Sequence, residues 1–179
     1  MKALLIIDMQ MGSFTHATPR YDTEGVVERI NILSEYFREN GLKVIFIQHD
    51  GTKQNEFIPN TNEWEILPQL IRKPTDLTIN KTANDSFYKS NLEETLKANN
   101  ITHLFITGCA TDFCVDSTIK SALTKDYEIT VIKDGHTTGN RPNIEAKTVV
   151  DYYNWLWENM IPTETGIKLA TTSELFDKL

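Results

Sequence analysis

The chain has 179 residues, of which 40% are hydrophobic and 24% are charged, and both values are typical of a globular protein. Its length fits a single domain over residues 1–179. The formal net charge of −7 at pH 7 argues against a nucleic-acid partner, because the phosphates of nucleic acids bind basic surfaces.

The first predicted element is a buried strand at residues 3–7, a continuous apolar run. This run is too short for a signal-peptide core or a transmembrane helix, so the sequence predicts a cytoplasmic protein with no membrane partner. Apolar residues then recur at helical spacing over 26–37, and Asn40-Gly41 is a typical helix C-terminus. A second strand is predicted at 44–47.

Residues 50–75 are polar and contain three prolines, a composition that predicts an irregular connection. One short helical patch is expected around residues 64–71. Long irregular connections in compact domains are commonly lids, binding loops or oligomer contacts. We therefore expect this segment to contribute to substrate specificity.

Short apolar runs and helical patterns alternate along the rest of the chain. Strands are predicted at residues 76–79, 102–107, 128–132 and 167–170, and helices at 91–99, 115–123, 143–159 and 172–179. Ser90 and Glu93 form a predicted capping box for the helix at 91–99. Apolar strands between amphipathic helices are typical of a parallel sheet covered on both faces. The predicted fold is therefore an α/β fold, a three-layer α/β/α sandwich around a mainly parallel, six-stranded sheet.

Polar side chains follow five of the six predicted strands, and ligands of open α/β sheets bind at the carboxyl ends of the strands. In chain order these residues are Asp8, then Gln48, His49 and Asp50, then Asn80 and Lys81, then Cys109, Thr111, Asp112 and Cys114, and finally Asp134 and His136. Because parallel strands end at the same edge of a sheet, the sequence predicts a functional site there.

Cys114, Lys81 and Asp8 form a chemically coherent set. Cys114 lies at a strand-to-helix turn, where free backbone N–H groups and a helix N-terminus favour the nucleophilic thiolate. Lys81 is the candidate cation beside the thiolate, and Asp8 is the candidate base that then carries the proton to the leaving group. The backbone N–H groups of Ala110 and Cys114 are the candidate oxyanion hole.

Each of these residues also has an ordinary structural explanation. A cysteine after a strand is most often a small buried apolar residue, and lysines are usually solvated. Cys109, at the strand end, is assigned to packing. A Cys109–Cys114 disulfide is opposed by the short turn between the two residues and by a reducing cytosol. His49 and His136 are as readily structural hydrogen-bonding residues as substrate contacts.

Motifs for cofactors are missing from the sequence. His49-Asp50 is a possible metal pair, but no further histidine follows at ligand spacing, and neither C-x-x-C nor H-x-x-x-H occurs. No glycine-rich G-x-G-x-x-G segment follows the first strand, and no Walker loop is present. The sequence therefore predicts neither a bound metal nor a nucleotide cofactor.

Three segments together resemble the isochorismatase-like cysteine hydrolases, a superfamily that includes the nicotinamidases. They are Leu4–Gln10, Lys81 with Ser86-Phe87, and Gly108–Val115. The resemblance implies a Rossmann-like fold and a catalytic triad of Asp8, Lys81 and Cys114. It also implies a non-proline cis peptide between Cys109 and Ala110, cleavage of C–N bonds in small amides through a thioester, and a homo-oligomer.

The leading hypothesis is a cysteine hydrolase acting on a small amide, imide or ureido substrate. The predicted substrate-binding residues are Phe14, His49, Trp64, Phe87, Phe113 and His136. One alternative is a metal-assisted, nicotinamidase-type hydrolase that uses His49 and Asp50, although nicotinamidases carry further histidines after the second strand. Another alternative is a non-catalytic binding or scaffold protein on the same fold. Cys114 argues against vinyl-ether hydrolysis, because isochorismatases proper lack this nucleophile.

Overall fold

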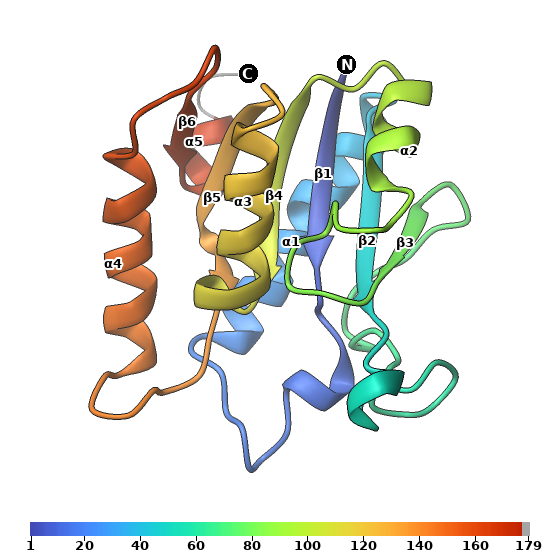
Figure 1. Cartoon of the computed structure of the whole chain (residues 1–179), viewed down its shortest axis with the longest axis vertical. Helices are drawn as coiled ribbons and strands as arrows, with labels where there is room; N and C mark the ends of the chain where they lie inside the picture. Colours follow the sequence, from blue (N-terminus) through green and yellow to red (C-terminus); the bar gives the residue numbers. More distant parts are fainter. Residues whose placement is uncertain (177–179) are drawn as a thin grey trace.

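Six strands form one sheet in this computed structural model, which describes residues 1–176 (Figure 1). The strands are β1 (Lys2–Ile7), β2 (Lys43–His49), β3 (Leu77–Lys81), β4 (His103–Cys109), β5 (Glu128–Thr137) and β6 (Ile167–Ala170). Their order is β3-β2-β1-β4-β5-β6, and every neighbouring pair is parallel. The predicted α/β fold with a six-stranded sheet is confirmed.

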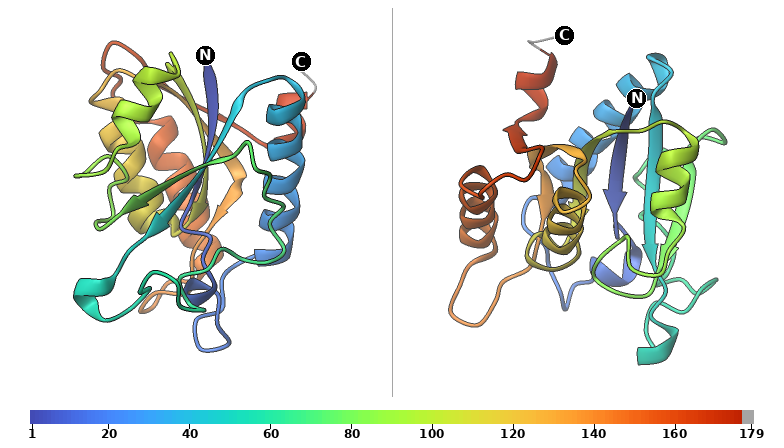
Figure 2. Two further views of the ribbon diagram at one scale, coloured as in Figure 1. Left: turned by 90° about the vertical axis from the view of Figure 1, so that its right-hand side faces the viewer. Right: turned by 45° about the horizontal axis from the view of Figure 1, so that its top comes forward.

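Helices cover both faces of this sheet (Figure 2). One face carries α1 (Thr23–Glu39) and α5 (Thr172–Phe176), and the other carries α2 (Leu92–Ala98), α3 (Asp116–Leu123) and α4 (Ala146–Glu158). A π-helical turn, Thr111–Val115, leads from β4 into α3. Residues 177–179, the end of the last predicted helix, lie outside the described residues.

Strand β1 shows how the apolar sequence builds two cores. Ala3, Leu5 and Ile7 belong to the core on the side of α2 and α3, whereas Leu4 and Ile6 belong to the core on the side of α1. All five side chains are fully buried. Successive side chains of a strand point to opposite faces, so an unbroken apolar run fits a central strand covered on both sides.

Helix α1 ends at the predicted Asn40-Gly41 pair. Gly41 adopts a positive φ of 67°, a left-handed conformation that costs glycine little. The Gly41 N–H donates to the Arg38 carbonyl oxygen at 3.0 Å, and the Leu42 N–H donates to the Phe37 carbonyl oxygen at 2.8 Å. These bonds satisfy carbonyl groups that the last helical turn leaves without partners.

Gly108 allows β1 and β4 to approach closely just before the turn that carries Cys114. Its φ is 123°, and a Cβ atom at this position would lie 2.2 Å from the Ile7 carbonyl oxygen. Any side chain would therefore collide with the backbone of β1. The carboxyl end of β4 is positioned by this contact.

The helical patch predicted around residues 64–71 is wrong: this segment forms turns. In a helix, the Trp64 carbonyl oxygen would accept a bond from the N–H of residue 68, but residue 68 is a proline and has none. Instead, Gln10 Nε2 and Gln48 Nε2 donate to this oxygen at 2.9 and 3.1 Å. The segment is thus tied to the ends of β1 and β2.

The predicted capping box of α2 is also wrong. The Ser90 hydroxyl donates to the Ser86 carbonyl oxygen and accepts a bond from the Leu92 N–H. The Glu93 carboxylate binds Lys97 and Lys125 at 2.6 and 2.8 Å, so it does not turn back to cap the helix. Two nearby lysines offer charged donors, which form stronger hydrogen bonds than a backbone N–H.

The connections that follow β1, β2 and β5 gather at the carboxyl edge of the sheet, at the bottom of Figure 1. Strand β5 extends to Thr137, so Asp134 and His136 lie within the strand rather than after it. Among residues 1–176, none of the helices has the length and apolar character needed to cross a membrane.

Substitution of Gly108 by alanine should destabilise the fold far more than substitution of Gly41. Both glycines have a positive φ, but a Cβ on Gly41 would meet nothing within 4 Å. We expect Gly41→Ala to lower the free energy of unfolding by about 1 kcal/mol, and Gly108→Ala by more than about 3 kcal/mol. Urea unfolding of the two variants measures the difference; equal losses would contradict the role given to the Ile7 contact.

Candidate active site

Three strands bring the predicted catalytic side chains together. Asp8 directly follows β1, Lys81 is the last residue of β3, and Cys114 lies in the π-helical turn after β4. Lys81 Nζ is 2.6 Å from Asp8 Oδ2 and 3.3 Å from Cys114 Sγ. The sequence positions of these residues are far apart, so the sheet topology creates the cluster.

Lys81 is buried, which excludes the solvated surface lysine considered above. Its ammonium group contacts Asp8 and Cys114 and donates a third hydrogen bond to the Ala83 carbonyl oxygen at 2.9 Å. Burial disfavours the charged form of Lys81, but the Asp8 carboxylate and the Cys114 sulfur outweigh this effect and raise its pKa. The lysine is therefore a permanent cation whose three protons all have acceptors.

The pKa of the Cys114 thiol is raised in this site, which favours the protonated thiol over the expected thiolate. Burial raises the pKa of Cys114, and the negative charge of Asp8 raises it further, whereas Lys81 lowers it. The strand-to-helix turn alone suggested the opposite direction. The sequence could not show that the thiol is buried beside a carboxylate. A protonated thiol requires a base before it can act as a nucleophile.

Asp8 has one oxygen available for that role. Its Oδ2 is held by Lys81, while its Oδ1 is buried and has no hydrogen-bond partner within residues 1–176. The residue also adopts a positive φ of 47°, which is uncommon for a side chain other than glycine. An unpaired buried acceptor is costly in a folded protein, so its presence beside a thiol is consistent with a proton acceptor.

The turn before Cys114 contains the cis peptide that the resemblance implied, between Cys109 and Ala110. The Ala110 carbonyl oxygen accepts bonds from the Phe113 and Val115 N–H groups. The Ala110 N–H donates to no acceptor within residues 1–176. Cys109 is fully buried, and burial raises the pKa of its thiol to about 12, as expected of a packing residue.

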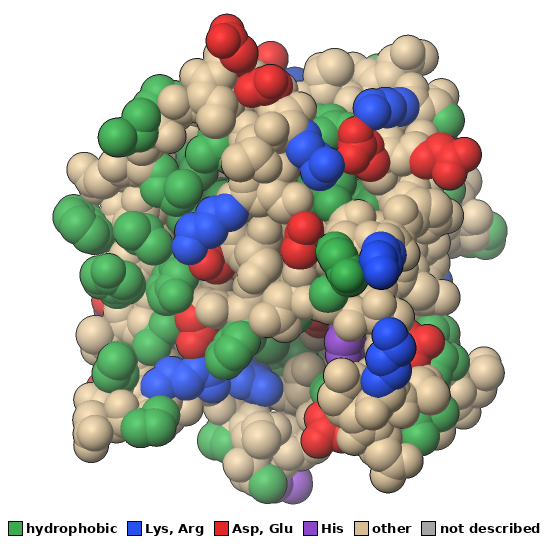
Figure 3. Space-filling view, viewed as in Figure 1, with side chains coloured by type: hydrophobic (Ala, Val, Ile, Leu, Met, Phe, Trp, Pro, Cys, Tyr) green, Lys and Arg blue, Asp and Glu red, His purple; other side chains and the backbone are tan. Residues whose placement is uncertain are grey.

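A cavity of about 240 Å³ opens over these groups. Figure 3 shows a hollow in the lower half of the molecule, bordered by basic side chains. Twelve residues line the cavity: Asp8, Gln10, Ser13, Arg20, His49, Phe57, Asn84, Cys109, Ala110, Phe113, Cys114 and Arg141. The predicted thiol, carboxylate and Ala110 turn thus share one solvent-accessible space.

Comparison with known proteins places this chain in a family. The family model "Isochorismatase domain" matches residues 2–160. The chain belongs to the isochorismatase family and is a hydrolase. It is 35% identical over 135 residues to the isochorismatase family protein YrdC of Bacillus subtilis, a match that covers 74% of this chain and 72% of YrdC.

Other members of the isochorismatase family carry names that state an activity. Streptothricin hydrolase of Streptomyces noursei is 28% identical over 141 residues, covering 79% of this chain and 51% of that protein. Ureidoacrylate amidohydrolase RutB of Caulobacter vibrioides is 36% identical over 99 residues, covering 52% of this chain and 43% of that protein. The chain therefore spans about half of the length of these two relatives.

Solved structures of the family share the fold over almost the whole chain. The crystal structure of an isochorismatase family protein superposes with a TM-score of 0.86 at 26% identity, covering 95% of this chain and 98% of the other. N-carbamoylsarcosine amidase from Thermoplasma acidophilum has a TM-score of 0.74 at 24% identity, with 97% of each chain covered. At this identity, the similarity to N-carbamoylsarcosine amidase shows a shared fold only.

Within this isochorismatase fold, the predicted substrate-binding residues divide into two groups. His49 and Phe113 line the cavity, and His49 Nδ1 is buried without a hydrogen-bond partner in residues 1–176. Four others lie outside the cavity lining: Phe14, Trp64, Phe87 and His136. Phe87 belongs to the core beneath α2, and Phe14 packs against the core beneath α1. Aromatic character alone did not distinguish a pocket wall from core.

Six cavity residues were missed by the sequence analysis: Gln10, Ser13, Arg20, Phe57, Asn84 and Arg141. Asn84 follows Lys81 by three residues, and its Oδ1 is 3.6 Å from Cys114 Sγ. Its position within one turn of the end of β3 is the sequence signal for its place in the site. Arg20 and Arg141 come from irregular connections, where no strand end marks them.

His136 forms hydrogen bonds that hold the π-helical turn containing Cys114. It shares a hydrogen bond of 2.9 Å with Thr111, the first residue of the π-helical turn, and one of 3.1 Å with Asn154 of α4. Burial lowers the pKa of His136 to about 4, so the ring is neutral at neutral pH. The residue joins β5, α4 and the turn that carries Cys114.

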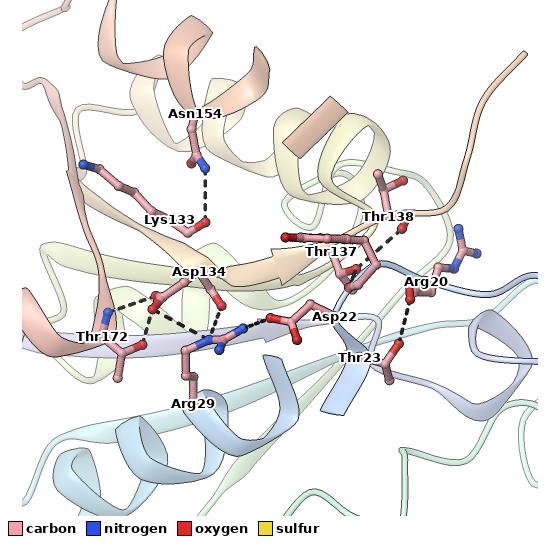
Figure 4. A network of polar contacts seen from close by, with 11 residues as sticks. Arg20, Asp22, Thr23, Arg29, Lys133, Asp134, Thr137, Thr138, Asn154 and Thr172 are labelled. Atoms are coloured by element: carbon pink, nitrogen blue, oxygen red, sulfur yellow. Dashed lines mark hydrogen bonds and ion pairs between the residues drawn. The ribbon is translucent and has the colours of Figure 1, made fainter. Parts of the chain in front are cut away.

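Asp134 also lies away from the cavity, in the polar network of Figure 4. Its Oδ1 accepts hydrogen bonds from the N–H and hydroxyl of Thr172, and Arg29 donates to its backbone oxygen at 2.6 Å. Arg29 in turn pairs with Asp22. Asp134 thus links α1, β5 and α5 and has a structural role.

The positions of His49 and Asp50 do not fit the metal site that the metal-assisted alternative requires. Asp50 Oδ1 accepts bonds from the backbone and hydroxyl of Thr52, at 3.0 and 2.5 Å, and Asp50 does not line the cavity. Residues 1–176 contain no cluster of three or more His, Cys, Asp or Glu side chains placed to hold a metal ion. The proposed chemistry therefore contains no metal-dependent step.

Substitutions of Asp8 and Lys81 should shift the reactivity of Cys114 in opposite directions. Asp8→Asn removes a charge that raises the pKa of the thiol, so alkylation by iodoacetamide should begin at lower pH than in the wild type. Lys81→Met removes the opposing charge and should shift alkylation to higher pH. Peptide mass spectrometry across neutral and alkaline pH measures both profiles, with buried Cys109 as internal control. Shifts in the same direction would contradict this charge balance.

His136 should make the fold sensitive to acid. Its pKa is lowered from 6.5 to about 4 on folding, so its contribution is complete above pH 6.5 and is lost as the pH falls through about 4. This corresponds to about 3 kcal/mol between the two values. His136→Gln, which cannot titrate, should show a weaker fall in urea-unfolding stability over this range. A variant that follows the wild-type pH dependence would disprove the assignment.

Proposed function

We propose that this protein is a cysteine amidohydrolase that cleaves a C–N bond in a small amide, imide or ureido compound through a thioester. The contacts that Lys81 makes with Asp8 and Cys114 carry this proposal. The thiol of Cys114 and the carboxylate of Asp8 line the cavity, and the buried ammonium group of Lys81 contacts both from behind the cavity wall. Nucleophile, base and electrostatic support are the groups that acyl transfer requires.

In the first step, Asp8 Oδ1 takes the proton of the Cys114 thiol while Sγ attacks the substrate carbonyl carbon. The carbonyl oxygen becomes an oxyanion, which the N–H groups of Ala110 and Cys114 bind. Lys81 keeps its positive charge and compensates the negative charge that moves from Asp8 to the sulfur and then to the oxygen. Removal of one oxyanion-hole donor typically costs about 10²–10³ in rate.

In the second step, the tetrahedral intermediate collapses and the C–N bond breaks. The leaving nitrogen takes the proton from Asp8 and departs as ammonia or an amine. Asp8 then removes a proton from water, whose oxygen attacks the thioester carbon. The proton returns to Sγ as the acid product leaves, so that the thiol and the carboxylate are restored.

The name of one relative, ureidoacrylate amidohydrolase, supports cleavage of a C–N bond. Ureidoacrylate amidohydrolase and streptothricin hydrolase are both hydrolases of the same family. The small cavity limits the choice of substrate for this chain, because its 240 Å³ is below the roughly 300–1,000 Å³ of sites for drug-sized ligands. We therefore propose a substrate no larger than a modified amino acid.

A cytoplasmic location and homo-oligomeric assembly stay predictions. Exposed apolar side chains on and after α4, including Tyr152, Trp155 and Ile161, are compatible with an assembled form.

Trp157, two residues after Trp155, is instead buried, and its indole N–H donates to Asp116. The two rings point to opposite sides, as expected from their spacing along a helix.

An ammonia-release screen over small amides and ureido compounds tests the proposed activity. Cys114→Ala should lower turnover by at least about 10³, because the thioester cannot form. Cys109→Ala is the matched control, since it removes a thiol from the same turn without removing the nucleophile, and it should retain activity. Mass spectrometry of acid-quenched wild-type protein should show the acyl group on the peptide that contains Cys114.

Turnover that survives Cys114→Ala would exclude covalent catalysis. A folded wild-type protein that binds amides in the cavity without hydrolysing any of them would instead favour the non-catalytic alternative.

A further inference from the structure

The charges around the cavity leave one cation without a counter-ion. Asp8 is paired with Lys81, and Arg141 is paired with Asp112 at 2.6 Å. Burial lowers the pKa of His49, so its ring is neutral at neutral pH. Arg20 also lines the cavity, and no carboxylate of residues 1–176 forms an ion pair with it. In a chain of net charge −7, the cavity is therefore positive.

The Arg20 side chain is held in place with donors to spare. Its Nε donates to the Ser13 carbonyl oxygen at 2.6 Å, and its backbone pairs with Gly139 in an isolated antiparallel bridge. Within residues 1–176, its two terminal nitrogens have no hydrogen-bond acceptor. A guanidinium carries five N–H donors, so most of those of Arg20 are available to a ligand.

Arg141 presents one further nitrogen beside it. Asp112 binds Nε and Nη2 of Arg141 at 2.6 and 2.8 Å, and Thr138 also contacts Nη2. This two-point contact fixes the plane of the guanidinium. Nη1 remains, and the face of the group lies 4.9 Å from the ring centroid of Phe113, another cavity residue. Arg141 thus supplies an oriented donor although its charge is neutralised.

The terminal nitrogens of the two arginines lie close together beside Gly139. A Cβ atom on this glycine would lie 3.0 Å from Arg20 Nη1 and 3.8 Å from Arg141 Nη1. The two nitrogens are therefore no farther apart than these distances combined. The two oxygens of one carboxylate can bridge such a gap, because each oxygen accepts an N–H bond of about 2.8 Å.

We propose that the substrate is a small carboxylic acid that also carries the scissile amide or ureido group. Its carboxylate binds Arg20 and Arg141 at the cavity wall, and its carbonyl faces Cys114 on the floor. This inference rests on the proposed amidohydrolase reaction for the identity of the scissile group. The planar guanidinium fork matches a carboxylate better than a single ammonium would.

A pair of alkylating reagents tests the anion site without knowledge of the substrate. Iodoacetate and iodoacetamide both alkylate Cys114: Sγ bonds to the CH₂ carbon of the reagent as iodide leaves. The first reagent carries a carboxylate where the second carries a neutral amide. Their rate ratio on Cys114, divided by the ratio on glutathione, should exceed one in the wild type. Arg20→Gln should lower this ratio about fivefold, and the effect should weaken in high salt.

Arg72→Gln is the matched control, because it removes the same charge outside the cavity, where Arg72 binds Thr78. It should leave the rate ratio unchanged. A wild-type ratio equal to that of glutathione would overturn the anion site. So would an Arg20→Gln ratio equal to that of the wild type, even if both reagents became slower.

Paired substrates separate the two proposals. N-carbamoyl amino acids carry a charged acid group, whereas their methyl esters are neutral and larger by one methyl group. The wild type should have a lower KM for the acids, and Arg20→Gln should raise that KM more than it lowers kcat. Equal use of acids and esters would overturn this inference and leave the amidohydrolase proposal intact. A retained iodoacetate preference without turnover of any amide would overturn the reaction and still support the anion site.

Discussion

The buried ammonium of Lys81 is the interaction on which the site depends. A charged amine without water is costly unless each of its protons finds an acceptor and its charge a counter-ion. Asp8, Cys114 and the Ala83 carbonyl oxygen meet this need together. The same contacts hold the thiol against the carboxylate. The contacts that stabilise the Lys81 cation are therefore the same contacts that position the proposed nucleophile.

The strand order explains why three distant segments satisfy that requirement. Strand β1 lies between β2 and β4, and β3 lies beyond β2, so Lys81 comes from the strand two places away from Asp8. His49 is the register partner of Lys81 and occupies the intervening strand end. A long lysine side chain can cross this distance, whereas a shorter residue would not reach both Asp8 and Cys114. Gly108 completes the arrangement by letting β4 close onto β1.

The sequence predicted the sheet and the central cluster because both follow from local patterns. Apolar runs identify buried strands, and polar residues at their carboxyl ends converge through topology alone. Features that depend on tertiary contact were not predictable. Pro68 has no N–H for the Trp64 carbonyl oxygen, and only the tertiary fold shows that Gln10 and Gln48 bind this oxygen instead. The protonated state of Cys114 depends on its burial and on the charge of Asp8.

Arg20 and Arg141 illustrate the same limit and show how the fold divides its tasks. The chemical groups lie at strand ends, where backbone pairing fixes them, and their charges cancel between Asp8 and Lys81. The arginines lie in connections, where sequence can vary without disturbing the sheet. Both approach Gly139, and Asp112 pairs with Arg141; neither Gly139 nor Asp112 belongs to the proposed catalytic set. The proposed reaction centre is therefore neutral, and the net positive charge of the cavity comes from Arg20 in a connecting segment.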